Sequence, residues 1–216
     1  MSRLASLPLR LSVRPYEILI CMTEQERFEN EINNAIAIKG LDKVEYSDIL
    51  VCKNTPQILL SVGLKDLPIL LSRKHLYMSI KEKNYKKHYK GLQIEEHIYK
   101  IPNFISDPAI ILRDTDDKHT GDILIVANAY DKDKFPIVIS IKANSTQMTH
   151  KDTTECNYMI TILGYNHIND LVNNAVANKN VLYYDKEKIQ EIDQFTGKKV
   201  SNTLSSLESN IILQQF

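Results

Sequence analysis

The spacing of apolar residues changes along this chain, and the change predicts how it is organised. Up to about residue 101 apolar positions recur mainly at helical intervals, whereas from residue 109 onward they form a series of short strand-like runs. Helices followed by consecutive strands predict an α+β architecture, with N-terminal helices packed on a roughly four-stranded antiparallel sheet and additional C-terminal helices. The chain has neither a glycine-rich phosphate loop nor strand–helix alternation, so a Rossmann or P-loop fold is excluded.

Three short N-terminal helices are predicted from caps and periodicity. A capping box at residues 23–26 precedes apolar positions at helical spacing, which predicts a helix over 24–38. A threonine and a proline suit the start of a short helix over 56–62, and a glycine ends it. An amphipathic helix is predicted over 94–101, and Pro102 is expected to close it.

A basic and aromatic segment, residues 73–90, stands out among the helical regions. It carries seven Lys or Arg residues against one acid, together with three tyrosines and two histidines. Ser72 can cap its start, and Gly91 lies where a left-handed residue would end it. If the segment is helical, its aromatic and basic side chains share a face that suits phosphates and stacked bases. A solvated surface helix is the alternative.

The strand-like runs follow in quick succession. Residues 68–71 are a short candidate strand before the basic segment. Four further strands are predicted after it, over residues 109–113, 122–130, 135–143 and 157–163. The polar turn DKDK joins the second and third of these, as in an antiparallel meander. Beyond them the pattern predicts a helix over 169–178, an extended run over 181–184, a helix over 185–192, and a polar tail with a helix capped by Ser205 and Glu208.

Composition narrows the class of protein. The 216 residues include 27 Lys or Arg and 27 Asp or Glu, so any affinity for nucleic acid must come from local clusters of charge. No apolar run approaches the roughly 18 residues of a membrane span. Three widely spaced cysteines and six scattered histidines match no disulfide framework and no metal-binding spacing, so neither a metal nor another cofactor is expected. The Arg-rich, acid-free N-terminus is interpreted as an extended leader, although its composition also suits a transit peptide.

Several ordered motifs resemble one family. They are DLPILLSRKHLY, the Lys-rich segment ending in KHYKGL, IPNFISDPAIIL, DILIVANAYDKDKFPIVISIK, NYMITILG and VLYYDKEKIQEI. In this order, over about residues 64–192, they resemble the phage MuF carboxy-terminal domain. That domain is attached to phage head-morphogenesis proteins and polymorphic toxins, and is placed in the barnase–EndoU–colicin–RelE group of metal-independent ribonucleases.

The resemblance implies a domain organisation and a site. The expected parts are an N-terminal leader and helical extension (1–53), the MuF-C-like domain (54–195) and a flexible tail (196–216). RNA is expected across the sheet. Where the family commonly shows a serine followed by a Tyr-Gly pair, this chain has Thr161 and Leu163-Gly164, so the hydroxyl is kept and the phenol is not.

Metal-free RNA cleavage needs a general base, a general acid and groups that stabilise charge on the phosphate. His88 is the predicted acid or base, because imidazole titrates near neutral pH. Lys81 is expected to share the helical face of His88, and Thr161 and Asn157 are expected to share a strand face because their separation is even. The predicted RNA-binding residues are Lys83, Lys86, Lys87, Tyr85 and Tyr89. The other histidines, at positions 75, 97, 119, 150 and 167, are expected to be structural.

These expectations converge on a metal-independent endoribonuclease-fold toxin or phage effector. Its partners would be RNA, with tRNA among the candidates, and an immunity or phage structural protein. It would act in the cytoplasm of its host or of a target cell. The alternative is an inactive RNA- or protein-binding module, or a phage accessory protein, on the same fold.

Overall fold

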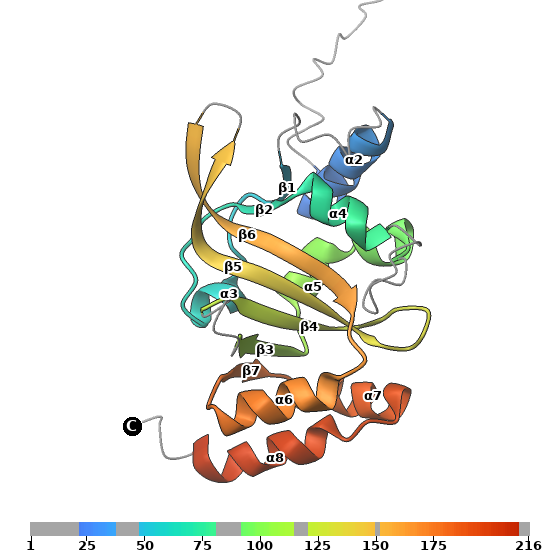
Figure 1. Ribbon diagram of the computed structural model, residues 1–216, viewed down its shortest axis with the longest axis vertical. Helices are drawn as coiled ribbons and strands as arrows, with labels where there is room; N and C mark the ends of the chain where they lie inside the picture. The colour runs from blue at the N-terminus through green and yellow to red at the C-terminus, as the bar shows by residue number, and fades with distance from the viewer. Residues whose placement is uncertain (1–21, 38–47, 81–91, 115–120, 150–151, 212–216) are drawn as a thin grey trace, which may run out of the picture.

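The fold is built around one large sheet, seen in a computed structural model (Figure 1). The structure describes residues 22–37, 48–80, 92–114, 121–149 and 152–211. The strands are β1 (Ile49–Cys52), β2 (Ile69–Leu71), β3 (Ile110–Arg113), β4 (Ile123–Tyr130), β5 (Pro136–Thr149), β6 (Asp152–Gly164) and β7 (Val181–Tyr184). They form a seven-stranded sheet in the order β1-β2-β6-β5-β4-β3-β7. The α+β class is confirmed, and the expectation of about four strands is corrected to seven.

The sheet is mixed rather than purely antiparallel. β2 runs parallel to β6, pairing Ile69 with Asn157 and Leu71 with Met159, whereas every other neighbouring pair is antiparallel. The parallel pair is possible because the long connection from β2 to β6 passes through several helices and the central meander. No local pattern in the sequence marks such a distant pairing.

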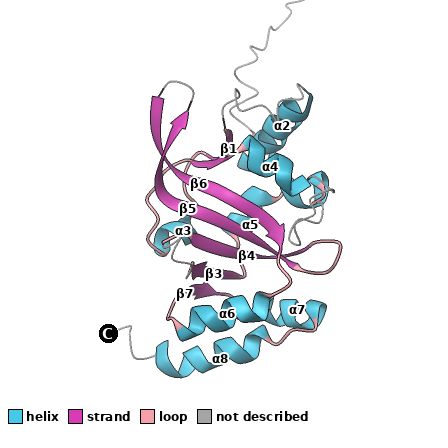
Figure 2. Cartoon of the chain, in the orientation of Figure 1, coloured by secondary structure: helices cyan, strands magenta, loops and turns pink. Residues whose placement is uncertain are grey.

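Helices cover both faces of the sheet, but unequally (Figure 2). On the first face, which carries Ile69, Ile139 and Met159, the core includes residues of α2 (Glu24–Ala37), α3 (Gln57–Ser61), α4 (Arg73–Ile80) and α5 (Ile101–Ser106). On the second face, α6 (Ile168–Ala177), α7 (Lys186–Thr196) and α8 (Val200–Ile211) pack on residues of β3 and β4 and on Val138. Figure 1 shows these three helices gathered at the β7 end of the sheet.

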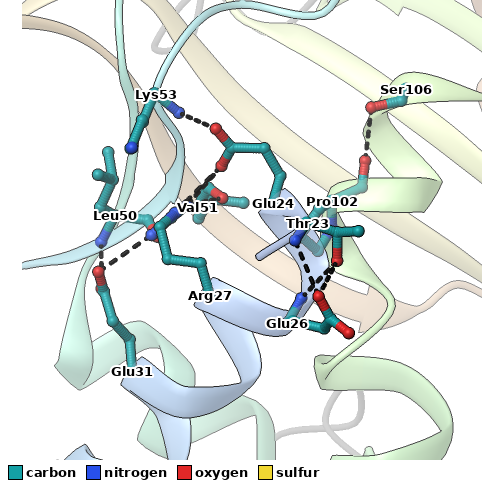
Figure 3. A network of polar contacts seen from close by, with 10 residues as sticks. All are labelled: Thr23, Glu24, Glu26, Arg27, Glu31, Leu50, Val51, Lys53, Pro102 and Ser106. Atoms are coloured by element: carbon teal, nitrogen blue, oxygen red, sulfur yellow. Dashed lines mark hydrogen bonds and ion pairs between the residues drawn. The ribbon is translucent and has the colours of Figure 1, made fainter. Parts of the chain in front are cut away.

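The helix α2 satisfies the edge strand β1 (Figure 3). The predicted capping box is present, because the Glu26 main-chain N–H donates to Thr23 Oγ1 (3.1 Å) and the Thr23 N–H donates to Glu26 Oε2 (2.8 Å). Further along the helix, Arg27 donates to the carbonyls of Leu50 (2.8 Å) and Val51 (2.6 Å). Side chains of α2 therefore occupy outward-facing polar groups of an edge strand, which would otherwise invite pairing with another chain.

The connection between α4 and β3 differs from the prediction. Residues 94–98 form a π-helical turn, and Pro102 lies in the first turn of a separate helix, α5, instead of closing the previous one. Proline suits that position because the first-turn N–H groups have no partner within the helix. His97 holds this turn in place: the Gln93 N–H donates to His97 Nδ1 (3.0 Å), and His97 Nε2 lies 2.9 Å from the Tyr130 carbonyl.

The C-terminal helices are linked by side-chain caps. Asp185 accepts from the N–H groups of Glu187 (3.0 Å) and Lys188 (3.1 Å) at the start of α7, and Gly197 ends that helix in a left-handed conformation. Asp193 then accepts from the Val200 N–H (2.7 Å) at the start of α8. Helix α8 therefore begins at Val200 rather than at the Ser205 cap that the sequence predicts.

Candidate functional site

Most of the predicted RNA-contacting residues lie outside the described part of the chain. These residues are His88, Lys81, Lys83, Lys86, Lys87, Tyr85 and Tyr89. The described part of the basic segment is α4, which begins at Arg73, directly after β2, and is described as far as Ile80. The two predicted site residues whose surroundings are described, Asn157 and Thr161, both lie on β6.

Asn157 is fully buried and holds three neighbouring segments together by hydrogen bonds. Its Nδ2 donates to Thr55 Oγ1 (2.8 Å) and to the Lys65 carbonyl (3.1 Å), and its Oδ1 accepts from the Asn144 N–H (2.9 Å). Thr55 in turn donates to the Leu67 carbonyl (2.7 Å). Asn157 thus links β6 to the loop before β2 and to an irregular turn of β5. With no exposed surface, it can influence a substrate only through the strand that it holds.

A bulge in β6 separates Asn157 from Thr161. Ser140 pairs with Thr161, but the next residue of β5, Ile141, pairs with Met159, so Ile160 is extra. The extra residue reverses the alternation of side chains, which is why Met159 and Ile162, three residues apart, both enter the core of the first face. Asn157 points to the first face and Thr161 to the second. The expectation that an even separation places them on one face does not hold, because that expectation assumes an unbroken pleat.

The second face of β5 and β6 carries a row of polar side chains. Ser140 lies opposite Thr161, and Lys142 lies opposite Tyr158, so the four side chains share this face. None of the four is buried, and Lys142 is exposed. In Figure 1, β5 and β6 cross the front of the molecule between α4 and α6. A hydroxyl pair, a phenol and an ammonium group therefore lie on the part of the sheet that the C-terminal helices leave uncovered.

A cluster of titratable groups adjoins this row where β1, β2 and α4 meet. Tyr158 hydrogen-bonds with Asp48 and with Ser72, and Asp48 also interacts with the charges of His75 and Arg73. Burial raises the pKa of the Asp48 carboxyl, despite the opposing Tyr158 hydrogen bond and the nearby cations. Burial is also the main reason why the pKa of Tyr158 is raised. Displaced pKa values that gather beside an open surface are a feature of functional sites.

His75 completes this cluster from α4. Burial lowers the pKa of its imidazole, and the neighbouring charge of Lys74 lowers it further, while a hydrogen bond with the Met159 main chain and the charge of Asp48 oppose the shift. Its Nδ1 is buried and has no hydrogen-bond partner. The ring is therefore held mainly in its neutral form near pH 7. No pattern around His75 marks it as a site residue, because two of its partners, Asp48 and the Met159 main chain, are distant in the chain.

The two described cysteines are buried. Cys52 and Cys156 are buried free thiols, and burial raises the pKa of Cys52 to about 12 and also raises that of Cys156. Such thiols stay protonated and are poor nucleophiles. Among the described residues, no group of three or more His, Cys, Asp or Glu side chains is placed to hold a metal ion. No described helix has the length and apolar character needed to cross a membrane.

Gly164, the glycine of the expected Tyr-Gly pair, has a packing role at the end of β6. A Cβ atom added at this position would fall on the carboxyl group of Asp131. Asp131 needs that space because its Oδ1 accepts from the Asp133 and Phe135 N–H groups (both 2.9 Å) and so closes the β4–β5 turn. The glycine therefore fixes the hairpin beside the second face, while Leu163 leaves that face without a phenol at its own position.

The chain can now be compared with known proteins. The family model described as "Phage MuF-C-terminal domain" matches residues 81–191, which is about half of the 216 residues. The chain belongs to this family, as its motifs predict. The match begins directly after α4 and includes β3 to β7, so it contains Thr161 and the polar row of the second face. No curated protein and no solved structure matches the chain.

Proposed function

We propose that this member of the phage MuF-C-terminal domain family is an endoribonuclease-fold toxin or effector of a phage or mobile element, which cleaves RNA without a metal ion. The observation that carries the proposal is the junction of the polar row with the Asp48–His75–Tyr158 cluster. Proton-transferring groups and hydroxyl donors adjoin one another there, on the part of the second face that α6, α7 and α8 do not cover. RNA would lie across β5 and β6, with the 81–90 segment supplying the lysines and tyrosines that contact phosphates and bases.

The proposed chemistry divides acid and base between two elements. A base removes the proton of a ribose 2′-hydroxyl, the 2′-oxygen attacks the adjacent phosphorus, and the bond from phosphorus to the 5′-oxygen breaks as an acid protonates that oxygen. His88 is the proposed base. Asp48 is the proposed acid, because its raised pKa keeps its proton to higher pH than an ordinary carboxyl group. The products are a 2′,3′-cyclic phosphate and a 5′-hydroxyl.

The remaining residues would stabilise charge on the phosphate or hold the site in position. Thr161, with Ser140 beside it, would donate hydrogen bonds to the non-bridging phosphate oxygens, where charge accumulates in the transition state. Lys81 would add a positive charge there. Asn157 would act as a positioning residue, since its buried hydrogen bonds fix the strand that carries Thr161.

The test of these roles is cleavage of single-stranded RNA in the presence of EDTA. His88→Ala, Asp48→Asn and Thr161→Val are each expected to lower the rate, by roughly 10²–10⁴-fold for the proton-transfer residues. Thr153→Val, an exposed threonine on the same strand, is the matched control and should leave the rate unchanged. Full activity of folded His88→Ala together with folded Asp48→Asn would overturn the proposed mechanism.

A binding module without catalysis is the second candidate, and the presence of Leu163 at the family's tyrosine position favours it. Such a module would hold RNA through the same face and the same lysines. A salt titration distinguishes it: binding would weaken steeply as salt rises, because counterions are released from RNA when lysines neutralise its phosphates, and no cleavage would accompany it.

A further inference from the structure

A second surface feature lies at the far end of β4, where the strand meets α7. Phe195 of α7 is 50% exposed, which makes it one of the large apolar side chains in the described residues that are left open to solvent. Its ring stacks on that of Tyr130, with 4.0 Å between centroids and 28° between planes. An aromatic ring supported from behind and open to solvent is a ready platform for a planar ligand.

Polar groups surround this platform. An open groove of about 410 Å³ is lined by Tyr130 and Phe195 together with Asn128, Glu191 and Gln194. Asn128 Nδ2 donates to Glu191 Oε2 (2.5 Å), and Asn128 Oδ1 accepts from the Tyr130 hydroxyl (2.9 Å). These two bonds fix the Glu191 carboxylate relative to the aromatic stack. Burial and the charge of Glu191 raise the pKa of Tyr130 to about 12, so its hydroxyl remains a donor.

A cation also lies beside the platform. Lys134 Nζ is 5.8 Å from the centre of the Phe195 ring. Lys134 belongs to the β4–β5 turn, which Asp131 closes through its bonds to neighbouring N–H groups. The ammonium group lies over the ring, whose other face is stacked on Tyr130, so a base that stacks on Phe195 takes its place and leaves the ammonium group free to pair with the nucleotide's phosphate.

We propose that this groove binds a guanine base of single-stranded RNA, stacked on Phe195 and read by Glu191 and Gln194. A carboxylate has two acceptor oxygens, and guanine offers two neighbouring donors, its N1–H and its 2-amino group, on one edge. The adjacent O6 accepts, and the Gln194 amide can donate to it. Adenine, cytosine and uracil do not present two adjacent donors followed by an acceptor. Aromatic stacking with hydrogen bonds to an exposed base edge is the usual mode of recognising unpaired RNA bases.

The groove is separate from the proposed cleavage site. Thr161 lies opposite Ser140, Ser140 lies opposite Leu124, and Asn128 follows four residues after Leu124, which places the two sites on the order of 15 Å apart. The inference rests on the proposed function in that it gives the same protein a preference among RNA sequences. It makes guanine recognition a property of α7 and the β4–β5 hairpin, away from the reacting phosphate.

Binding of the four ribonucleoside 3′-monophosphates to the full chain, measured by calorimetry, tests this inference without any cleavage step. Guanosine 3′-monophosphate is expected to bind at least about tenfold more tightly than the others. Phe195→Ala should weaken its binding about tenfold or more, and Phe195→Trp should preserve it. Glu191→Gln should abolish the preference for guanine, whereas Glu187→Gln, which removes the same charge from an exposed position one turn earlier, should not.

Equal binding of all four nucleotides, no measurable binding, or a guanine preference that survives in folded Phe195→Ala would each overturn the inference. Failure of the proposed cleavage gives a different result, because guanosine 3′-monophosphate would still bind while RNA stayed intact. Thermal melting of each variant shows that it is folded. The exposed position of Phe195 makes a large loss of stability unexpected.

Discussion

At the scale of single residues, Asn157 and Thr161 show how one strand serves two purposes. Asn157 uses its amide to hold three partners in a fully buried place, and Thr161 presents a half-buried hydroxyl beside Ser140 on the second face, away from α6, α7 and α8. The bulge at Ile160 is what directs them to opposite sides. Asn157 therefore has a structural role and Thr161 the proposed chemical one, so mutations can separate the two roles.

Replacing these two residues should lower the free energy of unfolding by unequal amounts. Asn157→Ala removes three buried hydrogen bonds, those to the Thr55 hydroxyl, the Lys65 carbonyl and the Asn144 N–H, so we expect the free energy of unfolding to fall by about 2–4 kcal/mol. Thr161→Val removes only a half-buried hydroxyl and should cost less than about 1 kcal/mol. Urea denaturation measures both. A large loss of stability in Thr161→Val alone would contradict the assignment of Thr161 to the site.

The His75 imidazole predicts a particular dependence of stability on pH. Its pKa in the folded protein is lowered, mainly by burial, so the unfolded chain binds the proton more tightly. The free energy of unfolding should therefore fall as the pH is lowered from the ordinary value of 6.5 through the folded pKa, and the full contribution is present above 6.5. Asp48, Lys74 and the Met159 main chain surround the ring and would set the size of the effect.

Denaturation at a series of pH values, comparing the wild type with His75→Gln, checks this expectation. The variant should lose part of the slope below pH 6.5. His167→Gln is the control, because the His167 side chain is 59% exposed and its removal should leave the slope unchanged. An unchanged slope in His75→Gln, or a slope of opposite sign, would contradict the lowered pKa.

Residue-level predictions from the sequence succeed only where the partners are local. The Thr23–Glu26 capping box is three residues long and is found as predicted. Asn157 donates to a residue 102 positions away, and His75 interacts with Asp48 and with the Met159 main chain, so no nearby pattern could have identified these partners. No sequence pattern predicts the bulge at Ile160 either, because isoleucine suits either face of a strand.

At the scale of elements, the edge strand β1 depends on α2. Arg27 donates to two carbonyls of β1 and also pairs with Glu24 (2.7 Å) and Glu31 (3.0 Å), while its own side chain is only 14% exposed. Glu31 accepts from the Leu50 N–H (3.0 Å) on the same edge (Figure 3). The helix therefore blocks the edge by hydrogen bonding as well as by packing Phe28 into the core.

Arg27→Ala should loosen this edge. We expect a loss of about 2–4 kcal/mol in the free energy of unfolding, because two carbonyls and two carboxylates lose a largely buried partner. Relative to the wild type, hydrogen exchange of the β1 amides should become faster, and that of the β4 and β5 amides should change less. Asn34→Ala, on the exposed side of the same helix, is the matched control and should change neither quantity. Unchanged β1 exchange in Arg27→Ala would show that α2 does not stabilise the edge.

Elements with a strong local pattern are found near their predicted places, and others are not. The helix predicted over 24–38 is found over 24–37, and the apolar cores of β3 and β4 are found where they were expected. β1 was missed because its four residues show no alternation. β5 and β6 extend well beyond their apolar parts into polar residues, where pairing with each other sustains the ladder.

At the scale of the whole molecule, one sheet provides two unequal faces. The first face is covered by the N-terminal helices and carries the main core, and the second face is covered by α6, α7 and α8 at one end only. The polar row and the Asp48 cluster lie beyond the part that these three helices cover, and the aromatic groove lies at the border with α7. The family was recognisable from ordered motifs, whereas this division depends on the parallel β2–β6 pair and could not be read from them.

The domain limits expected from the sequence remain a prediction. β1 and α2, which were assigned to an extension before residue 54, take part in the same sheet and the same core as the family-matched strands. A comparison of the stability of residues 54–195 with that of the full chain tests these limits.

We propose that the protein cleaves RNA by proton transfer at the second face. The most direct measurement is end-group analysis of single-stranded RNA incubated with the full chain in EDTA, with Asp48→Asn as the matched inactive variant. The wild type is expected to form products that end in 2′,3′-cyclic phosphate and 5′-hydroxyl, and Asp48→Asn should strongly reduce their amount. Intact RNA, cleavage only when a divalent metal is restored, or products with 5′-phosphate ends would contradict it.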